Sequence, residues 1–463
     1  MSEEFSYVTG QASLPAHIHL PQFSGIFSTQ ETARSVAADD FGHYVHRLPL
    51  AVLQPGSFED VVRVVQFARQ HGLKIAPRGQ SHSTHGQAQV EGGIIIDTAS
   101  LNTIHALHTD RVDVEAGVLW STLLRTTLEQ GLTPPVLPDY LDLSIGGTLA
   151  VGGIGGTSYR YGAIVDNVLE LQVVTGEGKL ETCSPNHQPE LFAAVLAGLG
   201  QCGILVKATL RLIPAKNDAR VFHLFYSDLA ALIHDDKTLI RDGRFDYVQG
   251  YVLPTPPGEW SYVLEVVSFY TPPADQLDNA RLLGGLNFMA GTEQIEERSY
   301  FNFSNRVVAQ AAVLKEKGVW HHPHPWLDMF VPASEVEHYV SAALADISPS
   351  DFGLLPVLLS ALNASCFRSP LLRLPTEETV FAFDILRTVT PNPEVVAKAV
   401  AHNRQLFERN RALGGTHYPI STIDLSHTDW ERHFGLVWEQ FLHAKQRFDP
   451  DNVLTPGQGI FPI

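Results

Sequence analysis

The sequence is poor in cysteine, in positive charge and in long apolar runs, and each shortage excludes a class of protein. Three cysteines in 463 residues (Cys183, Cys202 and Cys366) provide neither a disulfide framework nor a paired CxxC zinc signature. No stretch approaches the ~20 consecutive apolar residues of a membrane-spanning helix. Lys and Arg number 32 against 50 Asp and Glu, and the net charge of −18 argues against a nucleic-acid or anionic membrane surface as partner.

The N-terminal segment MSEEFSYVTGQASLPAH has neither the basic start nor the apolar segment of a secretory signal, so we expect a cytoplasmic protein. Apolar residues make up 44% of the chain, and its length predicts two or three domains. The first ~215 residues mix short predicted strands and helices. From about Phe222 onward, Pro-rich turns separate apolar strands from longer helices, such as those predicted over 335–345 and 393–413. This change predicts a domain boundary near Pro214.

The densest polar motif is residues 77–87, PRGQSHSTHGQ, which follow one predicted strand and precede the strand at 94–96. Backbone N–H groups of such a loop can form a nest for a pyrophosphate, although a plain polar surface turn has the same composition. His82 and His85 are three residues apart without an HExxH arrangement, so they are a weak zinc signal and we expect no metal site.

Glycine is concentrated in residues 139–156, DYLDLSIGGTLAVGGIGG, where it favours close approach of the backbone either to a ligand or to another segment. A formal GxGxxG occurs at 198–203, but a predicted helix precedes it and a predicted strand follows it. A dinucleotide fingerprint has the reverse order, so this motif does not indicate a nicotinamide dehydrogenase. The segment HHPHPW at 321–326 is predicted to be a loop that lines a pocket.

Several of these motifs together resemble the cytokinin dehydrogenases, within the flavoenzymes of the vanillyl-alcohol-oxidase type. Residues 78–88 are similar to the covalent-flavin loop of that family, and 139–149 to its active-site segment. Further matches follow in the same order along the chain: DDFG at 39–42, NVLEL at 167–171, VVTG at 173–176, HPWL at 324–327, FDP at 448–450 and PGQGIF at 456–461. Ordered matches across nearly the whole chain are more specific than any single motif.

The resemblance implies an α+β fold in which both chain ends form an FAD-binding domain, residues 1–214 and 420–463. A substrate-binding domain, residues 215–419, is inserted between them and is built on an antiparallel sheet covered by helices. FAD would be attached covalently through His82. The other residues at family positions that contact FAD are Gly79, Gln80, Ser81, Ser83, Gln87, Ala88, Ser144, Gly147, Ile154, Ile204, Tyr418, Thr455 and Gln458.

For the reaction, the resemblance places Asp139 as the active-site base. The implied substrate is a cytokinin, an adenine with an unsaturated isoprenoid side chain on N6, which loses a hydride to the flavin. Removal of the amine proton makes the adjacent carbon a better hydride donor, a task suited to a carboxylate. The imine product would hydrolyse to adenine and an unsaturated aldehyde, with a quinone-like compound or dioxygen as final acceptor.

Two departures from the plant members bear on the substrate. Gln249 stands where those proteins usually have Glu at the mouth of the channel, and Asp328, two residues after the implied substrate contact Trp326, stands where they usually have Asn. Moving a carboxylate changes which hydrogen bonds a substrate can make. An oxidase of a different amine or alcohol is therefore the alternative. A flavin-binding protein without turnover is a third reading, against which the retained Asp139 argues.

Overall fold

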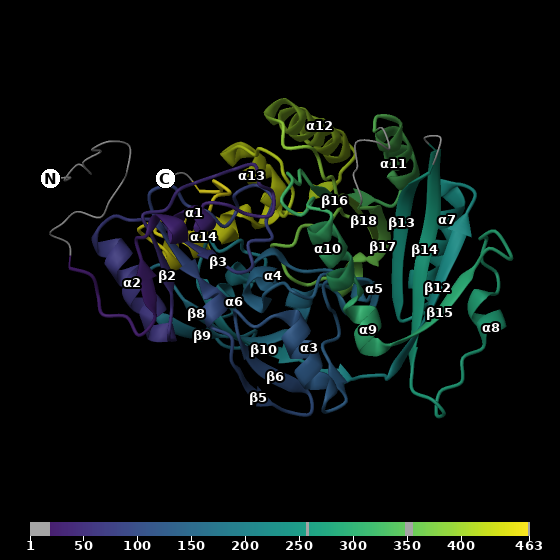
Figure 1. Cartoon of the computed structure of the whole chain (residues 1–463), viewed down its shortest axis with the longest axis horizontal. Helices are drawn as coiled ribbons and strands as arrows, with labels where there is room; N and C mark the ends of the chain where they lie inside the picture. The colour runs from purple at the N-terminus through teal and green to yellow at the C-terminus, as the bar shows by residue number, and fades with distance from the viewer. Residues whose placement is uncertain (1–18, 256–258, 348–354, 462–463) are drawn as a thin grey trace.

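The computed structural model describes residues 19–255, 259–347 and 355–461 (Figure 1). Its described residues mix helices with largely antiparallel sheets, which confirms the predicted α+β class. The first sheet has the strand order β1-β2-β4-β3, in which β2, β4 and β3 run parallel and β1 antiparallel. Its strands are β1 (Ile26–Ser28), β2 (Ala51–Gln54), β3 (Ile75–Arg78) and β4 (Ile94–Asp97).

Helix α2 (Phe58–Gln70) covers this sheet. The side chain of Ser57 accepts a hydrogen bond from the backbone N–H of Asp60 and so caps the N-terminus of this helix. The chain's C-terminal segment returns to the same sheet, because Leu454 forms a parallel bridge with Ile75 of β3. The buried Lys445 holds this return by donating to the backbone oxygens of Gln201 and Leu454.

The second sheet is antiparallel, with the order β5-β6-β10-β8-β9. Its strands are β5 (Ile104–Leu107), β6 (Arg111–Glu115), β8 (Val168–Val174), β9 (Leu180–Cys183) and β10 (Ile204–Arg211). Helices α3 (Trp120–Leu128), α4 (Ile145–Val151), α6 (Pro189–Val195), α13 (His427–Phe434) and α14 (Trp438–Phe448) belong to this half of the molecule, whereas α5 (Ser158–Tyr161) contacts the third sheet. The C-terminal α14 packs against α6, so the C-terminal segment joins the half that is formed by the first ~215 residues (Figure 1).

The third sheet is antiparallel throughout, with the order β15-β12-β14-β13-β17-β18-β16-β19. Its strands are β12 (Asp218–Tyr226), β13 (Tyr247–Thr255), β14 (Glu259–Tyr270), β15 (Gln294–Ser299), β16 (Leu327–Pro332), β17 (Val357–Asn363), β18 (Thr379–Ile385) and β19 (Thr416–His417). The helices of this half are α7 (Leu229–Asp242), α8 (Asn279–Leu283), α9 (Tyr300–Ser304), α10 (Arg306–Glu316), α11 (Val336–Ala345) and α12 (Pro393–Ala412).

The two faces of this large sheet differ in polarity. Alternate residues of β17 and β18, such as Leu359, Phe381 and Phe383, are fully buried in a core shared with α7 and α11. We call this the outer face. The residues between them, such as Ser360 and Asp384, lie on the inner face and line a cavity. Because side chains alternate along a strand, the same strands supply both a core and a site.

Helix α6, which precedes the glycines of 198–203, ends at Val195. Leu196 leaves the helical region, and the positive φ of Ala197 (54°) and Leu199 (55°) prevents its continuation. The glycines of 198–203 lie between α6 and β10, the order that the sequence predicts.

The division of domains at Pro214 and at 420 stays a prediction. Among the described residues, no helix is long and apolar enough to cross a membrane.

Candidate active site

A cavity of about 350 Å³ lies against the inner face of the large sheet. Loops after β3 and before α4 form its other walls, and the segment around Tyr418 and Gln458 closes it. The structure brings most of the sequence-predicted site residues to this one cavity: Gly79, Gln80, Ser81, His82, Ser83, Gln87, Ala88, Asp139, Ser144, Gly147, Ile154, Gln249, Trp326, Asp328, Tyr418 and Gln458 all line it.

Two predicted flavin contacts, Ile204 and Thr455, do not line this cavity. Ile204 is fully buried and its side chain packs in a core with Val174 and Leu454. Thr455 donates its backbone N–H to the carbonyl oxygen of Ile75, and its hydroxyl is buried without a hydrogen-bond partner among the described residues. The C-terminal segment therefore lines the cavity with Pro456 and Gln458 rather than with Thr455.

His82 projects into a group of aromatic rings. Its imidazole stacks on Phe41, with 4.1 Å between ring centroids, and also contacts Tyr140 and Trp326. Burial among these rings lowers the pKa of His82 to about 3. The imidazole is therefore neutral at physiological pH and keeps an unprotonated ring nitrogen.

The backbone on either side of His82 is shaped for close contact. Ser81 has φ of 54°, a conformation that few residues other than glycine adopt and that is concentrated at functional sites. Its hydroxyl is buried without a hydrogen-bond partner in the described part of the chain. A Cβ atom on Gly79 would lie 2.1 Å from the hydroxyl oxygen of Ser144, so glycine is required there. This loop offers an unmatched polar group to a ligand.

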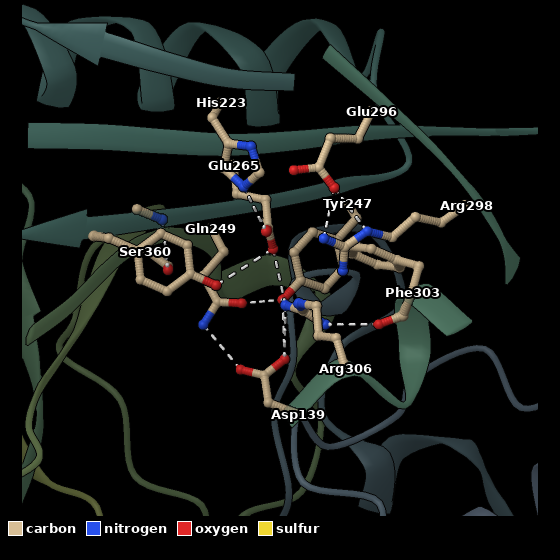
Figure 2. A network of polar contacts seen from close by, with 12 residues as sticks. Asp139, His223, Tyr247, Gln249, Glu265, Glu296, Arg298, Phe303, Arg306 and Ser360 are labelled. Carbon is tan, nitrogen blue, oxygen red and sulfur yellow. Dashed lines mark hydrogen bonds and ion pairs between the residues drawn. The ribbon is translucent and has the colours of Figure 1, made fainter. Parts of the chain in front are cut away.

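Asp139 enters the cavity from the opposite loop and is held by two donors (Figure 2). The Tyr247 hydroxyl donates to Oδ1 at 2.9 Å, and the Gln249 amide Nε2 donates to Oδ2 at 2.8 Å. Burial raises the pKa of Tyr247 well above its ordinary range, so this hydroxyl keeps its proton. Gln249, expected at a channel mouth, is instead only 5% exposed. Gly156 makes room for the ring, since a Cβ there would lie 2.4 Å from the Tyr247 ring.

Arg306, the first residue of α10, supplies the positive charge of this network. Its Nη2 donates to the Tyr247 hydroxyl at 2.7 Å and to Glu265 at 2.9 Å, and it lies 3.6 Å from Asp139 Oδ1. Burial alone would raise the pKa of Glu265, but Arg306 and the hydrogen bond with His223 lower it below its ordinary value. One guanidinium thus compensates two carboxylates.

Two further carboxyl groups line the same cavity. Asp328 of β16 and Asp384 of β18 are directly opposite each other in the sheet and are 2% and 9% exposed. Burial raises the pKa of Asp328 to about 8. Burial, with the negative charges of Asp328 and Asp139, raises the pKa of Asp384 well above its ordinary range. Both groups are therefore largely protonated at neutral pH.

Sequence reasoning missed Tyr247, Glu265, Arg306 and Asp384. A signal for two of them exists, because Glu265 and Asp384 each interrupt an apolar run within a strand, as Asp328 does. Such residues are rarely buried without a reason. Tyr247 and Arg306 carry no comparable signal, because the contacts of Arg306 with Tyr247 and with Glu265 join residues more than 40 positions apart in the sequence.

The remaining histidines of the two motifs have structural contacts. The Nε2 atom of His85 is 2.8 Å from Asp424 Oδ1. His324 is fully buried, and its ring stacks on Phe41 at 3.9 Å. Of the segment predicted to line a pocket, Trp326 does so. Within the described ranges, no three His, Cys, Asp or Glu side chains are grouped as a metal site requires.

Comparison with known proteins agrees with this geometry. The family profile described as cytokinin dehydrogenase 1, FAD and cytokinin binding, matches residues 255–461, and an FAD-binding-domain profile matches 49–184. Cytokinin dehydrogenase 2 of Arabidopsis thaliana is 34% identical, over 96% of this chain and 95% of its own. The chain belongs to the cytokinin dehydrogenase family. It is an FAD-dependent oxidoreductase.

Two further relatives cover similar spans. A Rhodococcoides fascians protein named uncharacterized oxidoreductase ORF5 in fasciation locus is 36% identical, over 94% of this chain and 98% of its own. Cytokinin dehydrogenase 10 of Oryza sativa subsp. japonica is 33% identical, over 94% and 88%. The cavity suits FAD, because it offers polar groups and glycine-lined walls to a polar, planar ligand. The polar groups are the Ser81 hydroxyl and the Trp326 indole N–H, neither of which has a hydrogen-bond partner among the described residues.

Proposed function

We propose that this member of the family oxidises adenines that carry an isoprenoid side chain on N6, giving an imine that hydrolyses to adenine and an unsaturated aldehyde. The observation that carries the proposal is Asp139, a carboxylate fixed in the cavity by Tyr247 and Gln249 with Arg306 beside it. A quinone-like compound or dioxygen would be the final electron acceptor. Bound FAD supplies the hydride acceptor.

The carboxylate of Asp139 is arranged to take a proton from the substrate's amine nitrogen. Each oxygen accepts one hydrogen bond from the protein, which leaves lone pairs free for a substrate N–H. The two donors fix the direction of the carboxylate, and the nearby Arg306 guanidinium offsets its charge. A base held in one orientation needs no reorganisation when the proton is transferred.

A spectrum tests the substrate class directly. Under anaerobic conditions, N6-isopentenyladenine should bleach the flavin absorption of the purified holoenzyme on mixing. Bands that persist with this compound, but bleach with another amine or an alcohol, would leave the oxidoreductase and replace its proposed substrate.

Replacement of the base tests the mechanism. Asp139→Asn should retain the flavin but slow its anaerobic reduction by roughly 10²–10⁴-fold, the usual contribution of a general base. Asp142→Asn is the matched control, since Asp142 accepts a hydrogen bond from Ser121 and does not line the cavity. An unchanged reduction rate in Asp139→Asn would remove Asp139 from this role.

The attachment of the flavin through His82 is part of the proposal. The neutral imidazole has a nitrogen lone pair available for a bond to the flavin's methyl carbon. After acid precipitation, the wild-type pellet should stay yellow, whereas His82→Ala should release its colour into the supernatant. His85→Ala, on the same loop but paired with Asp424, should behave as wild type. Colour retained in the His82→Ala pellet would exclude His82 as the tether.

A further inference from the structure

The cavity contains a second polar centre that the reaction at Asp139 does not use. It consists of Asp328 and Asp384, on adjacent strands of the inner face. We propose that these two residues form a carboxyl pair that determines substrate specificity by binding a hydroxyl group on the side chain of the N6-substituted adenine. This inference rests on the proposed function, because it refines the substrate class of the same site.

The geometry of the pair is set by the sheet. Asp328 and Asp384 face each other in the register of β16 and β18, and directly opposed side chains on one face of an antiparallel sheet have Cβ atoms about 5 Å apart. Apolar residues line the cavity around them: Leu358, Leu362, Ala382 and Leu386. Two carboxyl groups in such a wall are costly unless they have a partner.

The protein supplies little to match them. The Ser421 hydroxyl approaches Asp328 Oδ2 only at 3.4 Å, and Asp384 Oδ1 is buried with no hydrogen-bond partner in the described ranges. Neither carboxyl forms an ion pair with a described residue, because the guanidinium of this face, Arg306, is engaged by Glu265 and Asp139. An unmatched polar atom that lines a cavity indicates a ligand group.

The protonation state of the pair determines which kind of substrate group it can bind. The titratable groups acting on it are Asp139, which raises the pKa of Asp384, and the Tyr418 phenol, which stays neutral because burial raises its own pKa. The pair is therefore largely protonated, and a protonated carboxyl both donates and accepts hydrogen bonds. A hydroxyl group does the same. An unsubstituted prenyl side chain would leave both carboxyls unmatched.

The burial of the pair indicates which end of the substrate it contacts, namely the side chain rather than the amine. The Asp139 side chain is 28% exposed, whereas Asp328 and Asp384 are almost completely buried. A substrate whose amine contacts Asp139 can therefore place its side chain toward the buried pair. Its terminal hydroxyl would then replace the missing hydrogen-bond partners.

The test compares two substrates on the holoenzyme: N6-isopentenyladenine and the same molecule with a hydroxyl on a terminal methyl of its side chain. Wild type should prefer the hydroxylated compound in kcat/KM by ~10-fold or more, because a site with buried polar groups rejects an analogue that leaves them unpaired. Asp384→Leu should abolish or reverse this preference. Asp384→Asn keeps the shape and both hydrogen-bonding functions, so it should retain part of the preference. It provides a test even if the Leu variant does not fold.

Asp236→Asn is the matched control. Asp236 is an equally buried carboxyl whose pKa is raised to about 7 by burial, but it lies on α7 and accepts from the backbone N–H of Ala361. It should keep the wild-type preference. A substrate preference that is the same in wild type, Asp384→Leu and Asp384→Asn would overturn the specificity role.

Failure of the proposed function would look different. If wild type oxidised neither compound, the proposed reaction would be wrong. The role of the pair would then be tested by calorimetry, which measures the dissociation constants of the two compounds. Tighter binding of the hydroxylated compound that is lost in Asp384→Leu would support the pair. Equal binding of both compounds, or binding of neither, would overturn it.

Discussion

The outer face of the eight-stranded sheet buries Leu359, Phe381 and Phe383 against α7 and α11, while its inner face directs Asp328 and Asp384 toward the cavity. Both faces are buried, and both belong to the same strands. The outer residues lose water and gain apolar contacts, which stabilises the fold. The carboxyls of Asp328 and Asp384 lose water without full compensation, which costs stability and leaves polar groups that a ligand can match.

The largest effect is expected where the inner face depends on one cation. Arg306→Leu leaves Glu265 buried beside Asp139 without its guanidinium, so the free energy of unfolding should fall by ~3–5 kcal/mol. Chemical unfolding followed by circular dichroism measures this. Arg306→Lys, which keeps the charge but loses the fork of donors, should lose less. A loss below ~1 kcal/mol in the Leu variant would contradict the role of this ion pair.

A deletion on the outer face should affect stability alone. Leu359→Ala removes a fully buried side chain from the core with α7, and should cost ~2–5 kcal/mol of unfolding free energy. Its substrate preference and its rate of flavin reduction should stay at wild-type values, measured on the folded protein. A changed preference would mean that the two faces are not independent.

The smallest effect concerns pH. The pKa of Asp328 is raised from 3.8 to about 8, so the folded protein binds a proton that the unfolded chain releases. Its contribution to stability is complete below about pH 3.8 and is lost as the pH rises through about 8. Asp328→Asn should therefore make the decline of unfolding free energy with pH less steep. The slope will not vanish, because burial also raises the pKa of Asp236. An identical slope in the variant would exclude a protonated Asp328.

Local features of the fold could be predicted because their causes are local. Ser57 caps α2 three residues before the N–H that it binds, and the alternation of Val112 and Val114 with charged residues indicates β6. The end of α6 could not be predicted, because the positive φ of Ala197 depends on the loop that follows. Neither alanine nor leucine is a residue type that indicates a positive φ in a sequence.

The motifs of the sequence also indicated most of the cavity wall. The loop with His82 and the glycine-rich segment after Asp139 each carry their composition within about 20 residues. Their convergence on one cavity is a property of the fold, as is the position of Gln249 against Asp139 rather than at a channel mouth. Ile204, expected at the flavin, packs instead in the core between the first two sheets.

The sequence by itself determined the elements and the chemical groups available: a histidine in a polar loop, a carboxyl group at Asp139 and acidic residues within apolar strands. Only the tertiary structure decided which of these groups meet. Asp139 and Arg306 are far apart in the chain, and the opposition of Asp328 and Asp384 follows from strand register, with 55 residues between them. The pKa of each carboxyl then depends on burial and on neighbours brought by the fold, which no local pattern contains.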